Sequence, residues 1–72
     1  MNASSRMETE EVLRVKLGVL RREHADLDAA IRALQDGPPG EAFTLQRLKK
    51  RKLGLKDEIA RIEDRLIPDI LA

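Results

Sequence analysis

Apolar residues recur at alternating intervals of three and four positions along two separate stretches of the chain. In the first stretch the repeated positions are Leu13, Leu17, Leu20, His24, Leu27, Ile31 and Leu34. In the second stretch they are Leu45, Leu48, Lys52, Leu55, Ile59, Ile62 and Leu66. Because steps of three and four return to the same side of a helix, each stretch is predicted to form a helix with one long, mostly apolar seam.

The chain is predicted to reverse direction between these stretches, at Asp36-Gly37-Pro38-Pro39-Gly40. Gly37 can take the left-handed conformation that ends many helices, and neither proline can continue a helical hydrogen-bond ladder. The predicted boundaries are helix one over about 5–36, a turn over about 37–43, helix two over about 44–67 and a short apolar tail over 68–72.

Two residues have the chemistry of helix N-terminal caps. Ser5 and Glu8 have the spacing of a capping box, in which each side chain accepts a hydrogen bond from a free backbone N–H. Thr44 is the candidate cap of helix two, with Phe43 and Leu48 placed to form a hydrophobic staple around it. We therefore expect helix one to begin near Ser5 and helix two near Thr44.

Folding the two seams together about the turn gives five layers in which an apolar residue faces an apolar residue, and two adjacent layers, His24 with Leu55 and Leu27 with Lys52, that contain a polar residue. The predicted pairs are Leu13 with Leu66, Leu17 with Ile62, Leu20 with Ile59, Ile31 with Leu48, and Leu34 with Leu45. The predicted fold class is all-α: an antiparallel two-helix hairpin with coiled-coil-like packing. A chain of 72 residues builds only a small core, so we expect oligomerisation to complete it.

The charged residues also match across this hairpin. Residues 43–56 contain several basic side chains and no acidic side chain. The predicted pairing places this segment beside residues 23–36, which are mainly acidic. Exposed ion pairs are each worth only about 0–1 kcal/mol, so they help to specify the alignment of the helices more than their stability.

Binding to nucleic acid is the alternative interpretation of the basic stretch 47–52. It would place four side chains against phosphates: Arg47, Lys49, Lys50 and Arg51. We favour it less, because no aromatic residue is interleaved to stack on bases and no helix-turn-helix, zinc finger or basic zipper is recognisable. The 14 basic and 13 acidic residues of the chain nearly cancel, so any attraction to a polyanion must be local.

A polar layer interrupts the apolar seams near their middle. We predict an ion pair between Asp28 and Lys52 with His24 close by, acting as a layer that fixes the alignment of the helices. A catalytic or metal-binding role for His24 is disfavoured, because it is the only histidine and the chain has no cysteine. We expect no enzyme activity, no cofactor, no metal ion and no small-molecule substrate.

Two segments around this layer, EHADLDAAI at 23–31 and LKKRKLGLKDEI at 48–59, resemble the YdcH-like family of small bacterial proteins of unknown function. The resemblance spans roughly residues 20–62. It implies a short, soluble, cytoplasmic helical hairpin with coiled-coil character and no established enzyme activity. It carries over no catalytic residues.

Apolar residues outside the seams indicate where the hairpin is incomplete. They are Val12, Val15 and Val19 in helix one and Ile67, Ile70 and Leu71 at the C-terminal end. We predict that these two sets form an interface with a second copy, in an assembly resembling a four-helix bundle, or with a partner protein. The alternative is that the tail folds over the valines of its own chain.

The predicted function is that of a protein-interaction or structural module. No segment approaches the roughly 18 consecutive apolar residues of a membrane span, and residues 1–11 lack the apolar core of a signal peptide. We therefore expect a cytoplasmic protein that forms a homo-oligomer or binds a partner protein.

Overall fold

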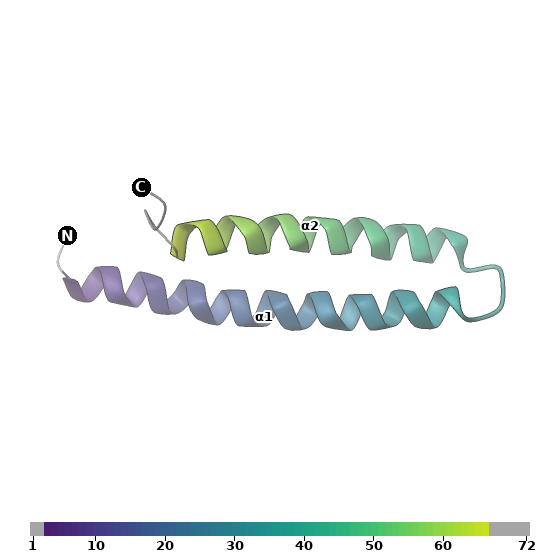
Figure 1. Cartoon of the computed structure of the whole chain (residues 1–72), viewed down its shortest axis with the longest axis horizontal. Coiled ribbons are helices and arrows are strands. Elements are labelled where there is room, and N and C mark those ends of the chain that lie inside the picture. The colour runs from purple at the N-terminus through teal and green to yellow at the C-terminus, as the bar shows by residue number, and fades with distance from the viewer. Residues whose placement is uncertain (1–2, 67–72) are drawn as a thin grey trace.

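The computed structural model describes the backbone of residues 3–66 and the side chains of residues 9–66. This part of the chain forms two helices, α1 over Ala3–Gln35 and α2 over Ala42–Leu66. They lie side by side and antiparallel, joined by a short loop at one end (Figure 1). The prediction of an all-α antiparallel hairpin is confirmed.

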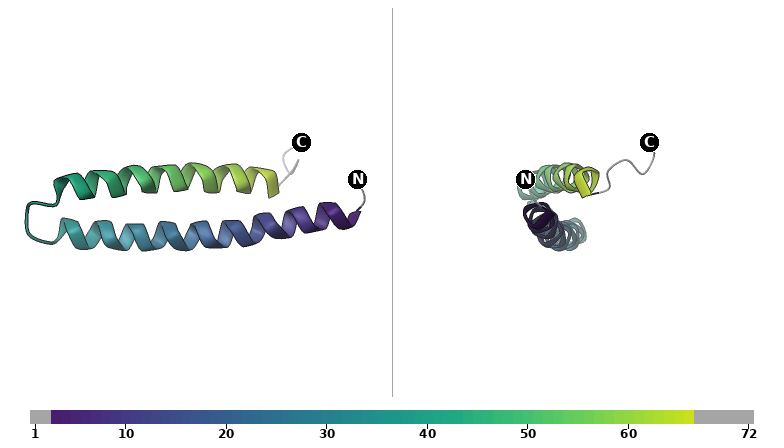
Figure 2. Two further views of the ribbon diagram at one scale, coloured as in Figure 1. Left: turned by 180° about the vertical axis from the view of Figure 1, so that it is seen from behind. Right: turned by 90° about the vertical axis from the view of Figure 1, so that its left-hand side faces the viewer.

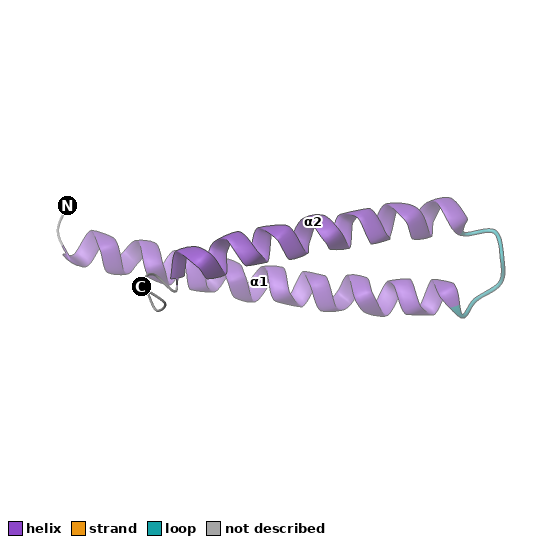
Figure 3. Ribbon diagram, turned by 45° about the horizontal axis from the view of Figure 1, so that its top comes forward, coloured by secondary structure: helices purple, strands orange, loops and turns teal. Residues whose placement is uncertain are grey.

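The two helices run nearly along each other and cross at a shallow angle (Figure 3). Seen end on, each helix has one side against its neighbour and the opposite side open (Figure 2). Because α1 is 33 residues long and α2 is 25, α1 extends past the end of α2 at the open end of the hairpin (Figure 1).

The core lies along the predicted seams. Its buried cluster consists of Leu17, Leu20, Leu55 and Ile62, with Leu13, Leu27, Ile59 and Leu66 packed against it half-buried. The cluster and the residues packed against it include both members of three predicted layers: Leu13 with Leu66, Leu17 with Ile62, and Leu20 with Ile59. Ile31 is also buried, nearer the loop. The apolar periodicity therefore predicted which faces of the helices meet.

The helix starts differ from the prediction. The first helix begins at Ala3, two residues before Ser5. The second begins at Ala42, and the backbone N–H of Leu45 donates to the carbonyl of Glu41 at 2.9 Å, so Thr44 lies inside the first turn and does not cap it. The predicted staple is also wrong, because the Phe43 side chain is 84% exposed. The helix starts two residues after Gly40, whose φ of 123° keeps it out of the helix.

The loop also reverses the chain at a different glycine. The positive φ belongs to Gly40, at 123°, whereas Gly37 does not take the predicted left-handed conformation. The last turn of α1 instead tightens, because the N–H of Gly37 donates to the carbonyl of Leu34, three residues back, at 3.3 Å. A turn closed in this way needs no left-handed residue at the end of the helix.

Gly54 is a weak point in the middle of α2 that substitution can test. A Cβ added there meets nothing within 4 Å, so Gly54→Ala is expected to raise the free energy of unfolding by about 1 kcal/mol through helix propensity alone. Chemical denaturation followed by circular dichroism measures the change. Gly40→Ala is the contrasting variant, because a φ of 123° strains any residue with a Cβ, and it is expected to destabilise. A loss of stability in Gly54→Ala would contradict the prediction.

Candidate functional site

The polar layer at the middle of the hairpin is built from both helices. Lys52 of α2 donates from Nζ to Oδ1 of Asp28 on α1 at 2.6 Å, and both side chains are about one-third exposed. Arg32, one turn further along α1, lies 3.3 Å from the second carboxylate oxygen of Asp28. The predicted ion pair between Asp28 and Lys52 is therefore present, with a second cation on the same carboxylate.

These neighbours change the acidity of Asp28. The hydrogen bond from Lys52 lowers the pKa of the Asp28 carboxyl below its ordinary value of 3.8, and partial desolvation opposes this change. The positive charges of Lys52 and Arg32 lower the pKa further. Asp28 is therefore ionised at neutral pH and is held between two cations.

An open groove of about 720 Å³ runs along this layer. Its lining residues are His24, Asp28, Ile31, Arg32, Gln35, Lys49, Lys52, Leu53, Lys56 and Ile59. Asp28 is the one carboxylate among them, and it already accepts from Lys52. In the part of the chain that the structure describes, no three or more histidine, cysteine or acidic side chains are grouped so that they could hold a metal ion.

Other ion pairs also join the two helices. Arg21 binds Glu63 at 2.6 Å, and Lys16 lies 3.6 Å from Glu58, so cations of α1 meet acids of α2 near the open end. Nearer the loop the signs are exchanged, because Arg51 of α2 lies 4.0 Å from Glu23 of α1. All of these side chains are well exposed, so each pair contributes little to stability and mainly favours this alignment.

The basic stretch is thus partly used inside the hairpin. Arg51 faces Glu23 and Lys52 binds Asp28. Arg47, Lys49 and Lys50 are exposed and make no ion pair with another residue in the described range 9–66. Binding of this stretch to nucleic acid stays a prediction.

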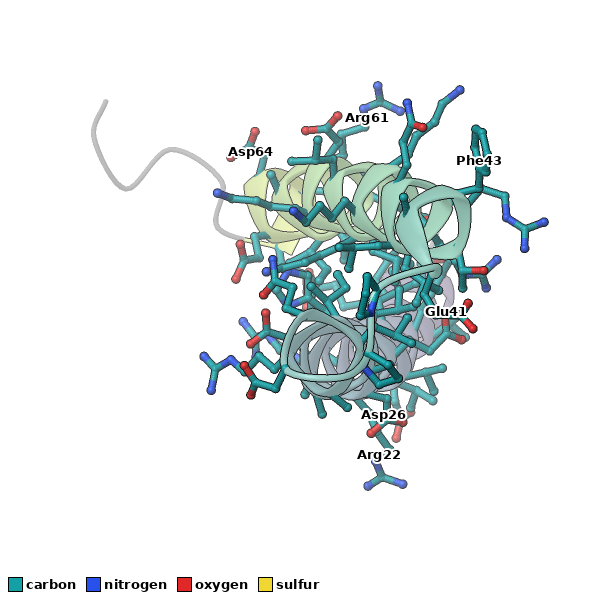
Figure 4. The ribbon with its side chains drawn as sticks, turned by 90° about the vertical axis from the view of Figure 1, so that its right-hand side faces the viewer. Arg22, Asp26, Glu41, Phe43, Arg61 and Asp64 are labelled. Atoms are coloured by element: carbon teal, nitrogen blue, oxygen red, sulfur yellow. The ribbon has the colours of Figure 1, made fainter. Side chains whose placement is uncertain are left out.

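The outer face of α1 carries three exposed valines, here called the valine stripe: Val12, Val15 and Val19. They are 64%, 64% and 52% exposed. A shallow groove beside them is lined by Val15, Gly18, Val19, Arg22, Glu23 and Asp26, all from α1. Figure 4 shows Arg22 and Asp26 pointing away from α2, so this groove lies on the side of α1 that α2 leaves uncovered.

Sequence reasoning placed further interface residues at Ile67, Ile70 and Leu71, which lie outside the described residues. It did not single out Leu53, which is 62% exposed and lines the groove beside the polar layer. The available signal was its position: Leu53 is apolar but falls between the seam residues Lys52 and Leu55.

These features define a small antiparallel helical hairpin with a central polar layer and an uncovered apolar stripe on its longer helix. The chain belongs to a family of proteins of unknown function, DUF465, whose model matches residues 17–63. This family includes the YdcH proteins, so the resemblance drawn from the sequence is confirmed. The matched range contains the polar layer and the loop, and Val12 and Val15 lie just before it.

Searches of curated proteins and of solved structures found no match to the chain. Neither helix, within the described residues, has a segment long and apolar enough to cross a lipid bilayer.

Proposed function

We propose that this chain is a non-enzymatic protein-interaction module that binds through the outer face of α1. The observation that carries the proposal is the valine stripe: three β-branched apolar side chains, each more than half exposed, aligned on a face that no other described element covers. Isolated exposed valines are ordinary on a protein surface, but three on one helix face beside a shallow groove favour a buried contact with another protein.

The hairpin suits this role because it holds a long helix with one face free. The second helix buries the seam of α1 through Leu17 and Leu20, and the ion pairs flanking the seam favour one alignment. The valine stripe is therefore presented on a helix whose orientation is fixed by packing on its opposite side. Such preorganisation lowers the entropic cost of ordering the binding surface when a partner binds.

The chemistry of the polar layer supports a role without catalysis. The Asp28 carboxylate is hydrogen-bonded by Lys52 and flanked by Arg32, so its charge is already compensated within the hairpin. A general base needs a free lone pair directed at a substrate in a site that excludes water, whereas the groove around Asp28 is open to solvent.

Replacing Val15 and Val19 together with lysine tests the proposal. Two ammonium groups on this face cannot be buried without a large desolvation cost, so association is expected to be lost while the hairpin stays folded. Light scattering follows self-association, and affinity capture with the purified wild-type and variant chains compares the recovery of any other protein.

Leu53→Lys is the control, because it introduces one lysine, against two in the double variant, at a 62% exposed apolar position of α2. It is expected to leave both measurements as they are in the wild type. The proposal fails if the double variant keeps the wild-type mass in solution and also recovers the same proteins, with helicity unchanged by circular dichroism.

A further inference from the structure

We infer that the outer face of α1 binds the same face of a second copy of the chain in antiparallel orientation, with each Arg22 opposite Asp26 of the other copy. This inference rests on the proposed function and names its partner. Two observations support it. Further residues continue the valine stripe along α1, and the charges and sizes of these residues are complementary to those of the same face on a second copy.

The outer face carries a repeat of its own, here called the outer repeat. Its positions are Val12, Val15, Val19, Arg22, Asp26, Ala29 and Ala33, spaced alternately by three and four. All seven side chains are exposed in the hairpin. At about 100° per residue, the outer repeat lies roughly 150° around α1 from the seam that α2 covers. The helix therefore has two faces suited to coiled-coil packing, and the hairpin uses one of them.

The order of residue types along the outer repeat makes the face complementary to itself. Three valines occupy one end, two alanines occupy the other end, and a cation and an anion stand between them. Placing a two-fold axis between positions 22 and 26 sets Arg22 opposite Asp26 of the second copy. Symmetry repeats the contact, so the centre of the interface contains two ion pairs.

The same alignment matches side chains by size on both sides of this centre. Val19 comes opposite Ala29 of the second copy, and Val15 comes opposite Ala33. Each of these layers then holds one larger and one smaller residue, so the two helices can keep a constant separation between them. Val12 would come opposite position 36, beyond the end of α1, so the paired contact runs from Val15 to Ala33 and is about 27 Å long at a rise of 1.5 Å per residue.

Charge also selects this orientation over the parallel one. A parallel pair in matching alignment would set Arg22 against Arg22 and Asp26 against Asp26, and like charges facing each other oppose association. Glu23, which lies close to the proposed axis, has its charge compensated within its own chain by Arg51 at 4.0 Å.

Gly18 supplies room for the close approach of a second helix. It lines the shallow groove with Val15 and Val19, and a Cβ added there would meet nothing within 4 Å in the single chain. Because the outer repeat and the seam lie on nearly opposite sides of α1, two hairpins joined this way form one layer of four helices with both α1 helices in the middle. This single layer differs from the assembly resembling a four-helix bundle that is expected from the sequence.

Reversing one charge in each of two variants tests the ion pairs. Arg22→Asp places two acids opposite two acids in a self-pair, and Asp26→Arg places two cations opposite two cations. Each variant alone is expected to raise the dissociation constant of the dimer by about tenfold or more. An equal mixture is expected to restore a complex of twice the 8.1 kDa mass of the chain, measured by light scattering or sedimentation. Failure of the mixture to associate, with both variants helical, overturns the inference.

Cysteine cross-linking tests the orientation, and the chain has no cysteine of its own to interfere. A mixture of Val19→Cys and Ala29→Cys chains is expected to oxidise to a mixed disulfide, because these positions face each other in the antiparallel pair. Val19→Cys alone is expected to cross-link slowly, since its two copies would stand about 15 Å apart along the helices. Rapid self-linking of Val19→Cys, with little mixed product, indicates a parallel pair and overturns the inference.

The outcomes separate this inference from the proposed function. In one outcome the wild-type chain stays monomeric at high concentration, and the Val15→Lys and Val19→Lys double variant no longer captures a different protein that the wild type captures. This outcome contradicts self-association but still supports the proposed interaction module. A double variant that changes neither measurement overturns both. A wild-type dimer that the double variant and each single charge reversal weaken, and that the equal mixture restores, supports both.

Discussion

Replacing Ile62 with alanine is expected to unfold much of the hairpin at room temperature. Ile62 is 5% exposed and belongs to the buried cluster with Leu17, Leu20 and Leu55. Truncating a buried isoleucine to alanine costs about 2–5 kcal/mol, and a single core in a chain below about 70–80 residues rarely supplies more than about 3–5 kcal/mol. The loss is therefore comparable to the whole stability of the fold. Helicity by circular dichroism and its thermal melting measure the effect.

Two variants calibrate this result. Ile62→Val removes one methylene and is expected to cost about 0.5–1.5 kcal/mol. Leu53→Ala removes more apolar volume from a side chain that is 62% exposed, so it is expected to melt close to the wild type. All chains are compared at one concentration, because any self-association adds to the apparent stability. A wild-type melting curve for Ile62→Ala would show that the seam is not what holds the helices together.

Reversing the charge of Lys52 is the second change with a large expected effect. Lys52→Glu would set a carboxylate in the position from which Nζ now donates to Asp28 at 2.6 Å. The variant loses this hydrogen bond and gains repulsion between two acids on facing helices, so its melting temperature at neutral pH is expected to fall well below that of the wild type. Lys52→Met, which removes the cation without adding an anion, is expected to lie between the two.

The pH dependence distinguishes this mechanism from a general loss of packing. In the wild type the pKa of Asp28 is lowered by folding, so its contribution to stability is complete above the ordinary value of 3.8 and is lost as the pH falls through the lowered pKa. In Lys52→Glu, protonation of either carboxyl relieves the repulsion. The difference in melting temperature between the two proteins is therefore expected to shrink as the solution is acidified below about pH 4.

A double variant completes the test. Asp28→Lys combined with Lys52→Glu exchanges the two charges and restores an attractive pair across the same helices. It is expected to recover part of the stability that Lys52→Glu loses, although Arg32, 3.3 Å from Asp28, would then stand beside a lysine. A gap between the wild type and Lys52→Glu that is constant from neutral pH to pH 3 would indicate that the ion pair is not the cause.

The charged pair within the hairpin and the proposed charged pair between two copies differ in what they specify. The pair of Asp28 with Lys52 lies inside the hairpin and favours one alignment of α1 with α2. The proposed pair of Arg22 with Asp26 of a second copy lies on the outer face and favours one alignment of two hairpins. In both places a wrong alignment would oppose like charges, so each pair contributes to specificity.

The amino-acid sequence by itself determined the two helices, the faces on which they meet and the ion pair at their middle. The reason is that a spacing of three and four residues places side chains on one face of a helix, whatever the rest of the fold. A short turn then leaves each helix only one neighbour within the chain against which this face can pack. The sequence pattern therefore assigns four residues to the core, Leu17, Leu20, Leu55 and Ile62. It also predicts the ion pair between Asp28 and Lys52.

Only the tertiary structure decided the details that depend on how the backbone closes and on what covers each face. The reversal uses Gly40 because α1 ends in a tightened turn at Gly37, and α2 starts before Thr44, which leaves Phe43 exposed. Several conformations of the loop satisfy the same turn residues, so its sequence does not choose among them. The outer face of α1 is uncovered because one neighbouring helix can cover only one side of it, and this geometry is what makes the valine stripe a candidate site.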